Sequence, residues 1–407
     1  MTTRVMYISY DGLLDPLGQS QVLPYIRELA RRGVNIRAIS FEKPELAAPR
    51  AIEKTKAELA AAGVRWHPLP YHRRPTLPAT AWDILRGISL ARSLAKRESV
   101  DLVHARSYIA GIIALAACRR TGAKFLFDMR GFWPDERVEG GGWKKDGLLY
   151  RSFKAIERRL LAGADGIVSL TRRGADILER DMLPAARGDS PPVAVIPTCA
   201  DLDRFLPVER QRSGVDNVRL IYLGSLGSWY MLEQMLAFFS VLRKQAPGST
   251  FRILTGSDPG MVERSAEAAG IGPDTLAAVS VETVPHERVP EKLAAADCSI
   301  FFIRPTFSKQ ASCATKFAES LACGVPVVIN SGVGDHDRHV RGPRTGVVLD
   351  SLDEETYRTA AVTLTELLKD PDTASRCRTV AEESFSLAGA VEQYLGLYER
   401  LTDGKRR

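Results

Sequence analysis

The sequence predicts an α/β protein with two parallel, doubly wound sheets. Short runs rich in valine, isoleucine and leucine recur at strand length along the chain, and amphipathic stretches of helical period separate them. The runs fall into two sets of about six, one in each half of the chain. Nearly continuous apolar strands are typical of parallel sheets covered on both faces, because parallel strands need crossover connections, which are usually helices.

The expected strands divide near the middle of the chain. The first set comprises Val5–Ser9, Asn35–Phe41, Leu102–Arg106, Lys124–Asp128, Gly166–Leu170 and Val193–Pro197. The second set comprises Leu220–Gly224, Phe251–Thr255, Val279–Thr283, Ser299–Ile303, Pro326–Asn330 and Gly346–Leu349. Between the strands, Gln21–Gly33 has its apolar residues on one helical face and predicts a single helix, which Ser20 can cap.

The loop Thr198–Phe205 is the expected domain boundary, since the first set of strands ends just before it and the charge balance changes sign there. Residues 1–200 hold 32 Lys/Arg and 21 Asp/Glu, whereas residues 201–407 hold 24 and 28. Residues 352–407 carry no strand signal and predict two or three helices. We therefore expect domains at 1–200 and 201–375, with C-terminal helices at 376–407 that pack back on the first domain.

Composition excludes several classes of protein. The chain has 407 residues, of which 45% are hydrophobic, and this is enough for two cores. It has no run of about 18 consecutive apolar residues and no N-terminal stretch that reads as a signal peptide, so we expect a cytoplasmic protein. Six cysteines without CxxC or zinc-ligand spacing predict reduced, mostly buried thiols. We expect no metal and no other cofactor.

The basic N-terminal half suits an anionic partner. A nucleic acid, an anionic membrane surface or a phosphorylated substrate would fit, and an arginine-rich solvated surface is the alternative without a partner. Nucleic acid is not expected, because aromatic residues are not interleaved with basic ones on any expected strand. The segment Tyr71–Arg97 has a basic flank and an apolar helical face, which suits either anionic lipid or an interior crossover helix. That face comprises Trp82, Ile84, Leu85, Ile88, Leu90 and Leu94.

Loops that follow the strands are the candidate sites, because ligands of open parallel sheets bind beyond the carboxyl ends of the strands. In the first, SYDGLLDPLGQSQ, Gly12 and Gly18 permit close backbone approach. The helix that follows offers unpaired N–H groups to a phosphate or a sugar hydroxyl. An ordinary βα turn is the alternative interpretation.

Two further loops place titratable residues at strand ends. HARSY and FDMRGFWPDE contain His104, Arg106, Asp128 and Arg130. These residues could supply a proton-transfer group, a carboxylate and cations that stabilise a departing diphosphate. We take Asp128, His104 and Arg130 as candidate catalytic residues; a buried structural role is the alternative for His104.

The second half contributes two more loops. In LGSLGSWY, Gly224 and Gly227 leave the backbone bare near a helix N-terminus, which suits a diphosphate. The spacing is neither the dinucleotide fingerprint nor a P-loop. In KQASCATKFAESLACGVPVV, Lys316 and Glu319 are three residues apart on one helical turn, and a surface ion pair is their plain alternative.

Four segments together resemble the family-4 retaining glycosyltransferases, in particular bacterial members that build surface polysaccharides. YISYDGLLDPLGQSQVLPYIRELARRG is similar to the first strand, loop and helix of that family, and IPTCADLDRF to its interdomain segment. VPEKLAAADCSIFFIRP and TKFAESLACGVPVV are similar to its donor-site strand and helix. The resemblance covers most of the chain.

This resemblance implies a GT-B fold, in which two Rossmann-like domains face each other across a cleft. It further implies metal-independent transfer of a sugar from a nucleotide-sugar donor in the C-terminal domain to an acceptor in the N-terminal domain, with retention of configuration. The acceptor would be a glycan or a lipid-linked glycan. The basic helical segment would place the protein peripherally at the inner face of an anionic membrane.

The resemblance also implies roles for individual residues. Glu319 matches the second glutamate of the family's paired-glutamate motif and would accept hydrogen bonds from the ribose hydroxyls. Lys316 and the backbone at Phe317 and Ala318 would lie near the diphosphate, where charge-assisted contacts stabilise the leaving group. The remaining expected donor contacts are Gly224, Ser225, Arg304 and Gly18.

The chain departs from the family pattern at three places. Ala311 stands where the first glutamate is expected, Ser225 follows Gly224 where basic residues are usual, and Arg106 replaces a histidine. Cations would then have to come from Arg304, Lys309, Lys316 or Arg130. The departures leave open a divergent active enzyme or a catalytically weakened relative.

Two other functions fit the same residues. A nucleotide-sugar epimerase of the same architecture would form product without an acceptor, and a non-catalytic nucleotide-sugar or glycan-binding protein would bind without turnover. Asp201 and Asp203 form a DxD, the metal-binding mark of another glycosyltransferase fold. Their place in the interdomain loop rather than at a strand end argues against a metal site.

Overall fold

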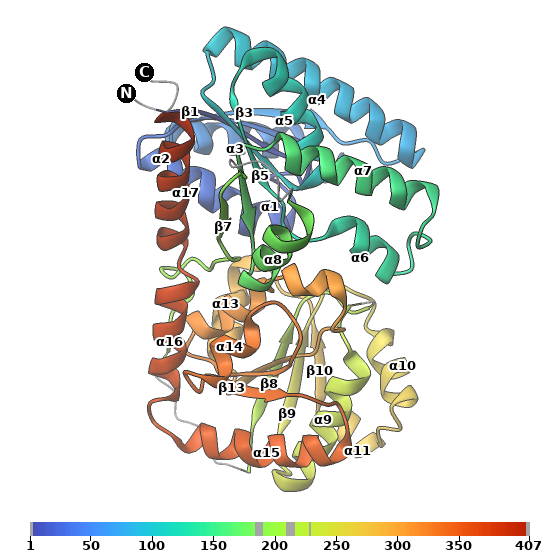
Figure 1. Cartoon of the computed structure of the whole chain (residues 1–407). Coiled ribbons are helices and arrows are strands. Elements are labelled where there is room, and N and C mark those ends of the chain that lie inside the picture. The colour runs from blue at the N-terminus through green and yellow to red at the C-terminus, as the bar shows by residue number, and fades with distance from the viewer. Residues whose placement is uncertain (1–2, 184–189, 209–215, 228, 404–407) are drawn as a thin grey trace. The chain divides into compact units, whose positions relative to one another are not determined.

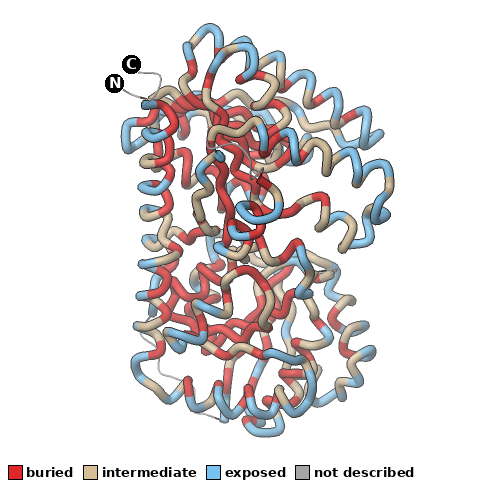
Figure 2. The backbone as a smooth tube through the Cα atoms, in the orientation of Figure 1, coloured by how far each residue is buried: buried red, intermediate tan, exposed pale blue. Residues whose placement is uncertain are grey.

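A computed structural model describes residues 3–183, 190–208, 216–227 and 229–403 (Figure 1). The chain divides into two compact units. Unit 1 comprises Met1–Pro197 and Leu387–Arg407, and unit 2 comprises Thr198–Ser386. Each unit has a buried central sheet with exposed residues on the outer faces of its helices (Figure 2).

Unit 1 contains a seven-stranded parallel sheet in the order β3-β2-β1-β4-β5-β6-β7. Its strands are β1 (Arg4–Ser9), β2 (Asn35–Glu42), β3 (Val64–Pro70), β4 (Leu102–Arg106), β5 (Lys124–Asp128), β6 (Gly166–Ser169) and β7 (Val193–Val195). The chain runs outward from β1 to one edge and then crosses to β4, which pairs with the other side of β1. This reversal of strand order is where open α/β sheets bind ligands.

Helices cover both faces of this sheet. They are α1 (Pro16–Gln21), α2 (Leu23–Arg31), α3 (Pro49–Ala61), α4 (Thr76–Glu98), α5 (Ser107–Thr121), α6 (Trp133–Glu139), α7 (Leu148–Gly163), α8 (Arg172–Ile177) and α17 (Leu387–Thr402), with a π-helical turn at Leu178–Met182. Phe127 of β5 meets α5, whereas its neighbour Leu126 lies on the face that Leu401 of α17 covers. Successive strand residues point to opposite faces, so α5 and α17 lie on opposite sides of the sheet.

Unit 2 contains a six-stranded parallel sheet in the order β10-β9-β8-β11-β12-β13. Its strands are β8 (Arg219–Leu223), β9 (Thr250–Leu254), β10 (Val279–Glu282), β11 (Cys298–Phe301), β12 (Val327–Asn330) and β13 (Gly346–Leu349). Its helices are α9 (Leu232–Gln245), α10 (Gly260–Ala268), α11 (Pro273–Leu276), α12 (Val289–Ala294), α13 (Thr315–Ala322), α14 (His336–Arg341), α15 (Glu354–Lys369) and α16 (Thr373–Ser384), with short 3₁₀ turns at His286–Arg288 and Phe307–Ala311. Phe301 packs on Phe317 of α13 and Phe302 on Phe238 of α9, so helices cover both faces here too.

The predicted fold class is confirmed, and each predicted strand is present. The sequence missed β3, because its run VRWHPLP is interrupted by a histidine and two prolines and is only partly buried. Proline cannot donate to a strand ladder and is tolerated at a sheet edge, which is where β3 lies.

The helix predicted at Gln21–Gly33 does not begin at Gln21. The chain forms two helices, α1 and α2, which meet at Val22, and Ser20 lies inside α1 rather than capping a helix. Pro24 lies in the first turn of α2, where its missing N–H costs no hydrogen bond. A proline there favours a new helix start over a continuous helix.

The unit boundaries differ from the expected 200 and 375. They fall at Pro197 and Ser386, because α16 packs on α13 of unit 2 and Arg378 of α16 donates to the carbonyls of Leu202, Phe205 and Ala322. Only α17 joins unit 1, where it packs against α2 and β4. Residues 352–402 therefore form three helices, of which the last alone belongs with the first unit.

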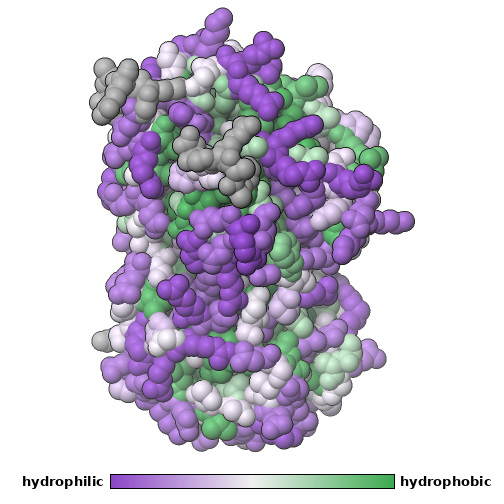
Figure 3. Space-filling view, in the orientation of Figure 1, coloured by the Kyte–Doolittle hydropathy of each residue, from purple (hydrophilic) through white to green (hydrophobic). Residues whose placement is uncertain are grey.

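The apolar residues of α4 lie on two sides of the helix rather than on one. Asp83, Gly87, Ala91 and Leu94 are buried on the side that packs on α5, whereas Trp82 and Leu85 are exposed. Hydrophilic and hydrophobic residues are interspersed over the face of the molecule that Figure 3 shows. In the described part of the chain, no helix is both long enough and apolar enough to cross a bilayer.

Candidate functional site

The loop after β1 is closed by a carboxylate that the sequence did not reveal. Glu42, at the end of β2, is buried and accepts the backbone N–H groups of Leu13 at 2.8 Å and Leu14 at 3.0 Å. These two loop amides are therefore not available to a phosphate. A Cβ on Gly18 would lie 1.9 Å from the carbonyl oxygen of Gly12, so Gly18 is needed for packing within the loop.

His104 lies in the middle of β4, not at its end, and its side chain is only 1% exposed. The imidazole packs against Tyr7 of β1 and against Tyr394 of α17, with ring centroids 4.4 and 5.0 Å apart. Its Nδ1 is 2.7 Å from the hydroxyl of Tyr398. Burial lowers the pKa of His104, although the neighbouring Asp128 acts in the opposite direction.

Asp128 ends β5 and lies at the centre of a charged network. Its Oδ2 is 3.5 Å from His104 Nε2 and 3.7 Å from Arg130, and it accepts the hydroxyl of Tyr394 at 3.2 Å. Burial alone would raise the pKa of Asp128, but Arg130 and His104 together hold it below its usual value. The structure thus brings together the three candidate catalytic residues His104, Asp128 and Arg130.

Arg130 has the most solvent contact of the three, with 13% of its side chain exposed compared with 2% for Asp128. It adopts a φ of 60°, and Ser107, which follows β4, adopts 71°. Left-handed conformations are unfavourable for residues with a side chain and cluster at functional sites. Arg106, the replacement for a family histidine, instead pairs with Asp11 after β1 at 2.7 Å.

In unit 2, Lys316 and Glu319 lie on α13 and are both buried. The ammonium of Lys316 lies 3.5 Å from the ring centroid of Tyr230 and 4.3 Å from that of Tyr222. It makes no hydrogen bond to any described residue. A surface ion pair, the plain alternative for these two residues, is therefore not what the structure contains.

Burial dominates the electrostatics of this pair. It lowers the pKa of Lys316 well below the usual lysine value, with Glu319 acting in the opposite direction. It also raises the pKa of Glu319 to about 7, although Arg204 and Lys316 oppose this shift. Burying a cation among aromatic rings without a hydrogen-bond acceptor costs free energy, unless a ligand supplies an anion.

Gly224 leaves the space in which such an anion could lie. It follows β8 with a φ of 134°, and a Cβ there would lie 2.8 Å from Lys316 Nζ. Ser225 is exposed, and its carbonyl accepts the hydroxyl of Tyr222 at 2.6 Å. Thus Gly224, Lys316 and the two tyrosines form one cradle at the carboxyl end of the sheet of unit 2.

The other predicted donor residues have different surroundings. Phe317 and Ala318 are fully buried, and the amide of Phe317 already donates to the carbonyl of Ala314. Arg304 is exposed in the loop after β11, where its backbone N–H donates to Trp229. Lys309 is buried, with its ammonium 3.9 Å from the ring centroid of Trp229.

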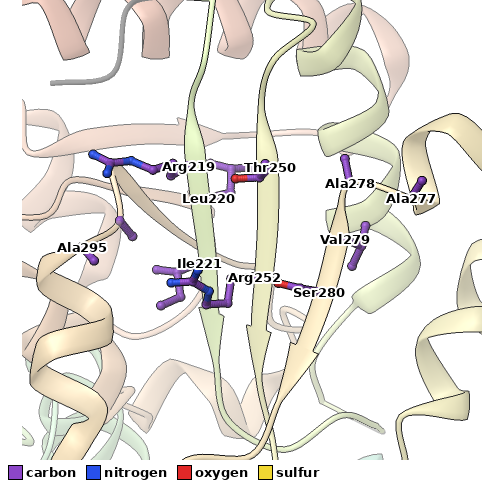
Figure 4. A pocket seen from close by; sticks show the side chains of 11 residues that line it. Arg219, Leu220, Ile221, Thr250, Arg252, Ala277, Ala278, Val279, Ser280 and Ala295 are labelled. Carbon is purple, nitrogen blue, oxygen red and sulfur yellow. The ribbon is translucent and has the colours of Figure 1, made fainter.

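The DxD and the pocket of unit 2 lie outside this cradle. Asp201 accepts the amide of Asp203 in a local turn, and no cluster of potential metal ligands occurs in the part of the chain that the structure describes. A pocket of about 260 Å³ opens at the amino ends of β8, β9 and β10 (Figure 4). Arg219 and Arg252, which line it, already pair with Asp297 and Glu282.

Comparison with protein families matches residues 18–199 to the family described as "Glycosyl transferase 4-like domain". The matched segment covers less than half of the chain. It contains His104, Asp128 and Arg130 and begins at Gly18. A search of curated proteins found no significant sequence match to the chain.

Solved structures match nearly the whole chain. Sucrose-phosphate synthase from Thermosynechococcus elongatus is 16% identical with a TM-score of 0.71, and the match covers 99% of this chain and 100% of that one. A glycosyltransferase from Rickettsia africae is 14% identical with a TM-score of 0.69, covering 98% of both chains. HepE from Anabaena, in complex with UDP and glucose, is 14% identical with a TM-score of 0.69, covering 97% and 99%. The fold is GT-B.

Several residues around the network of unit 1 and the cradle of unit 2 were not predicted from the sequence. Tyr394 and Tyr398 reach the network from the C-terminal helix, and Tyr222 lies against Lys316. Tyr230, which also lies against Lys316, belongs to the LGSLGSWY loop that the sequence indicates. Tyr222 lies near the end of β8, and Tyr394 and Tyr398 lie in α17, where a tyrosine in a mostly apolar pattern is compatible with many roles. Only the folded chain brings these phenols to their partners.

Proposed function

We propose that the protein is a metal-independent glycosyltransferase that moves a sugar from a nucleotide-sugar donor to an acceptor with retention of configuration. The observation that carries this proposal is the buried ammonium of Lys316, which lacks a hydrogen-bond acceptor beside the bare backbone of Gly224. A diphosphate would supply the missing acceptors. The match of residues 18–199 to the glycosyl transferase 4-like family and the GT-B fold support the same conclusion.

Lys316 would act mainly on the leaving group. As the bond between the sugar and the diphosphate breaks, negative charge grows on the diphosphate, and a desolvated cation stabilises that charge more strongly than a hydrated one does. Glu319, three residues further along α13, would accept hydrogen bonds from the ribose hydroxyls. Its pKa of about 7 means that deprotonation near neutral pH would strengthen these bonds.

In unit 1 we assign proton transfer and the stabilisation of charge during the reaction to the network of His104, Asp128 and Arg130. Arg130, the most exposed of the three, would contact the substrates, whereas His104 and Asp128 would hold its position. The left-handed backbone of Arg130 supports this assignment, since such strain persists only where the surroundings require it.

The donor screen begins with UDP-sugars, because the structural relative HepE was crystallised with UDP and with UDP-glucose. The acceptor proposed is a glycan or a lipid-linked glycan in polysaccharide biosynthesis. The structural relative WaaG, a glycosyltransferase involved in lipopolysaccharide biosynthesis, is 16% identical with a TM-score of 0.67.

We also propose a peripheral position at an anionic membrane. Leu77, Trp82 and Leu85 are exposed on α4, and Arg73 and Arg86 are exposed close to them in sequence. Apolar side chains beside cations are the composition of interfacial helices. Co-sedimentation with liposomes of anionic lipid tests this, and salt-insensitive or absent binding contradicts it.

A thermal-shift screen against UDP-, GDP-, ADP- and dTDP-sugars tests the donor site. A ligand at a hundredfold excess over its Kd stabilises the folded state by about 2.7 kcal/mol. We expect one nucleotide class to raise the Tm of the wild type, Glu319→Ala to lose that shift, and the surface control Glu291→Ala to keep it. No shift with any donor contradicts the donor site.

Turnover then separates the three functions. A glycosyltransferase releases nucleotide faster when an acceptor is present, an epimerase converts the donor without an acceptor, and a non-catalytic binder does neither. Mass spectrometry of the products distinguishes these outcomes.

A further inference from the structure

A histidine and a buried aspartate lie together at the carboxyl edge of the sheet of unit 1, outside the network described above. His72 follows β3, Asp83 lies in α4, and Tyr10 follows β1. Asp83 is 0% exposed at its side chain, whereas 40% of the side chain of His72 is exposed. Packing alone does not explain a fully buried carboxylate at this position.

Asp83 accepts several hydrogen bonds. It accepts the hydroxyl of Tyr10 at 3.0 Å, the backbone N–H of His72 at 3.0 Å and His72 Nδ1 at 2.5 Å. A carboxylate can only accept, so Nδ1 must carry the proton in this contact. When Nδ1 alone carries a proton, the lone pair lies on Nε2, and the described hydrogen bonds of His72 use only its backbone N–H and Nδ1.

The surroundings of His72 suit a small polar ligand. Tyr71 is half-buried, and its ring meets that of Tyr10 edge-on at 5.5 Å. The hydroxyl of Tyr10 binds the same carboxylate as His72 does. Ligand sites combine such apolar surface with a few fixed polar groups. A lone-pair nitrogen whose orientation is fixed by a buried carboxylate is an acceptor for one hydroxyl group.

We propose that His72, oriented by Asp83, binds a hydroxyl of the acceptor sugar through Nε2. The inference rests on the proposed glycosyl transfer for the identity of the ligand, but its site lies in unit 1 and uses none of the donor residues. Asp83 is a positioning residue, because it acts through His72. The chemical class of ligand is a pyranoside.

Asp83→Asn separates a positioning role from a merely structural one. An asparagine presents an NH₂ group as well as an oxygen, and when the NH₂ faces Nδ1 the ring must accept there and carry its proton on Nε2. Nε2 then becomes a donor. The variant therefore reverses the hydrogen-bonding sense of His72 while the side chain keeps its shape.

The experiment uses the full-length protein with ¹⁵N-labelled histidine, and octyl glucoside, galactoside, mannoside and N-acetylglucosaminide as probes. Wild type, His72→Gln, Asp83→Asn and the control His67→Gln are compared. His67 lies on β3, upstream of His72, and its Nε2 makes no hydrogen bond to a described residue. We expect the wild-type His72 to be the Nδ1–H tautomer and at least one pyranoside to shift its Nε2 resonance. Circular dichroism checks that each variant is folded.

Affinity for that pyranoside should fall about 3- to 10-fold in His72→Gln, the loss of one hydrogen bond. Asp83→Asn should move the proton to Nε2 and weaken binding similarly, and His67→Gln should bind as the wild type does. Donor binding in the thermal-shift screen should be unchanged in all four proteins. Thus a failure of the donor screen rejects the proposed function but does not affect the measurement of pyranoside binding at His72.

Three results would overturn the inference. They are a wild-type His72 protonated on Nε2, an Nε2 resonance that no pyranoside moves even with nucleotide bound, and an Nε2 resonance that the nucleotide-sugar alone moves. The last result would assign His72 to the donor. If Asp83→Asn unfolds, His72→Gln alone decides the question.

Discussion

The two units differ in how they hold a buried charge. In unit 1, the carboxylate of Asp128 lies within 4 Å of both Arg130 and His104 and accepts the hydroxyl of Tyr394. In unit 2, the ammonium of Lys316 lies against aromatic rings and makes no hydrogen bond to a described residue. The first charge is balanced inside the protein, and the second is not.

The pKa shifts show the same contrast between the buried charges of the two units. Arg130 and His104 outweigh burial at Asp128, so its pKa falls and its charged form is favoured in the folded state. At Lys316 and Glu319 burial outweighs the neighbours, so both charged forms are disfavoured. The network of unit 1 therefore stabilises the fold, whereas the pair of unit 2 costs stability until a ligand arrives.

Asp128→Asn should have the largest effect on the ligand-free protein. It removes the counter-charge of Arg130 and should lower the free energy of unfolding by about 3 kcal/mol, as for other broken buried pairs. Urea denaturation measures this. The control Asp176→Asn breaks an exposed ion pair with Arg172 and should cost less than about 1 kcal/mol. Equal losses in the two variants would mean that Asp128 is not part of a stabilising network.

Glu319→Gln should remove a pH dependence of stability. The folded carboxyl has a pKa of about 7 compared with 4.5 for the free side chain, so between these values the folded state binds more protons than the unfolded state. The stability of the wild type should therefore fall as the pH rises through this window, by up to about 3 kcal/mol relative to Glu319→Gln. Denaturation at pH 5 and pH 8 measures the difference. A gap between the two proteins that does not change with pH contradicts the raised pKa.

Tyr398→Phe should cost about 1 to 3 kcal/mol, because it leaves Nδ1 of His104 buried without a partner. Tyr394→Phe is the matched control from the same helix. It should cost less, since Asp128 keeps its contacts with Arg130 and His104. Thermal unfolding of both variants compares them, and a larger loss in Tyr394→Phe would reverse the assignment of the two tyrosines.

The fold was predictable because its signal is local. Each strand that lies in the interior of a sheet is a short apolar run, and such a run is visible without knowing its neighbours. The edge strand β3 was missed because Pro68 and Pro70 interrupt its run, and an edge position tolerates them. The start of α2 and the end of unit 2 depended on a proline in the first turn and on contacts of Arg378, which a periodic pattern does not contain.

The candidate site was predictable where its residues lie in sheet strands or just after them, as His104, Asp128 and Arg130 do, or share one short motif. Lys316 and Glu319 lie in one short motif whose resemblance to a family suggested a role. Tyr398 and Tyr394 meet His104 and Asp128 across 294 and 266 positions of sequence, and no spacing rule connects residues so far apart. Glu42 was missed for a related reason, since its partners are backbone amides that any sequence provides.

Lys316→Met should change the stability of the ligand-free protein least and in the opposite direction. Methionine has a similar shape and no charge to desolvate, so the variant should be as stable as the wild type or slightly more stable near neutral pH. The difference should shrink as the pH rises toward 10.5, because the lowered pKa lets the folded wild type lose its proton first.

The most direct test is to measure both the Tm of Lys316→Met and its affinity for the nucleoside diphosphate that the donor screen identifies. Calorimetric titration gives the affinity. We predict an unchanged or higher Tm together with affinity for that diphosphate weakened about 10- to 100-fold, the loss of a charge-assisted hydrogen bond. A variant that loses stability but binds the diphosphate as tightly as the wild type would show that Lys316 supports the core and that the cradle around Gly224 is not the diphosphate site.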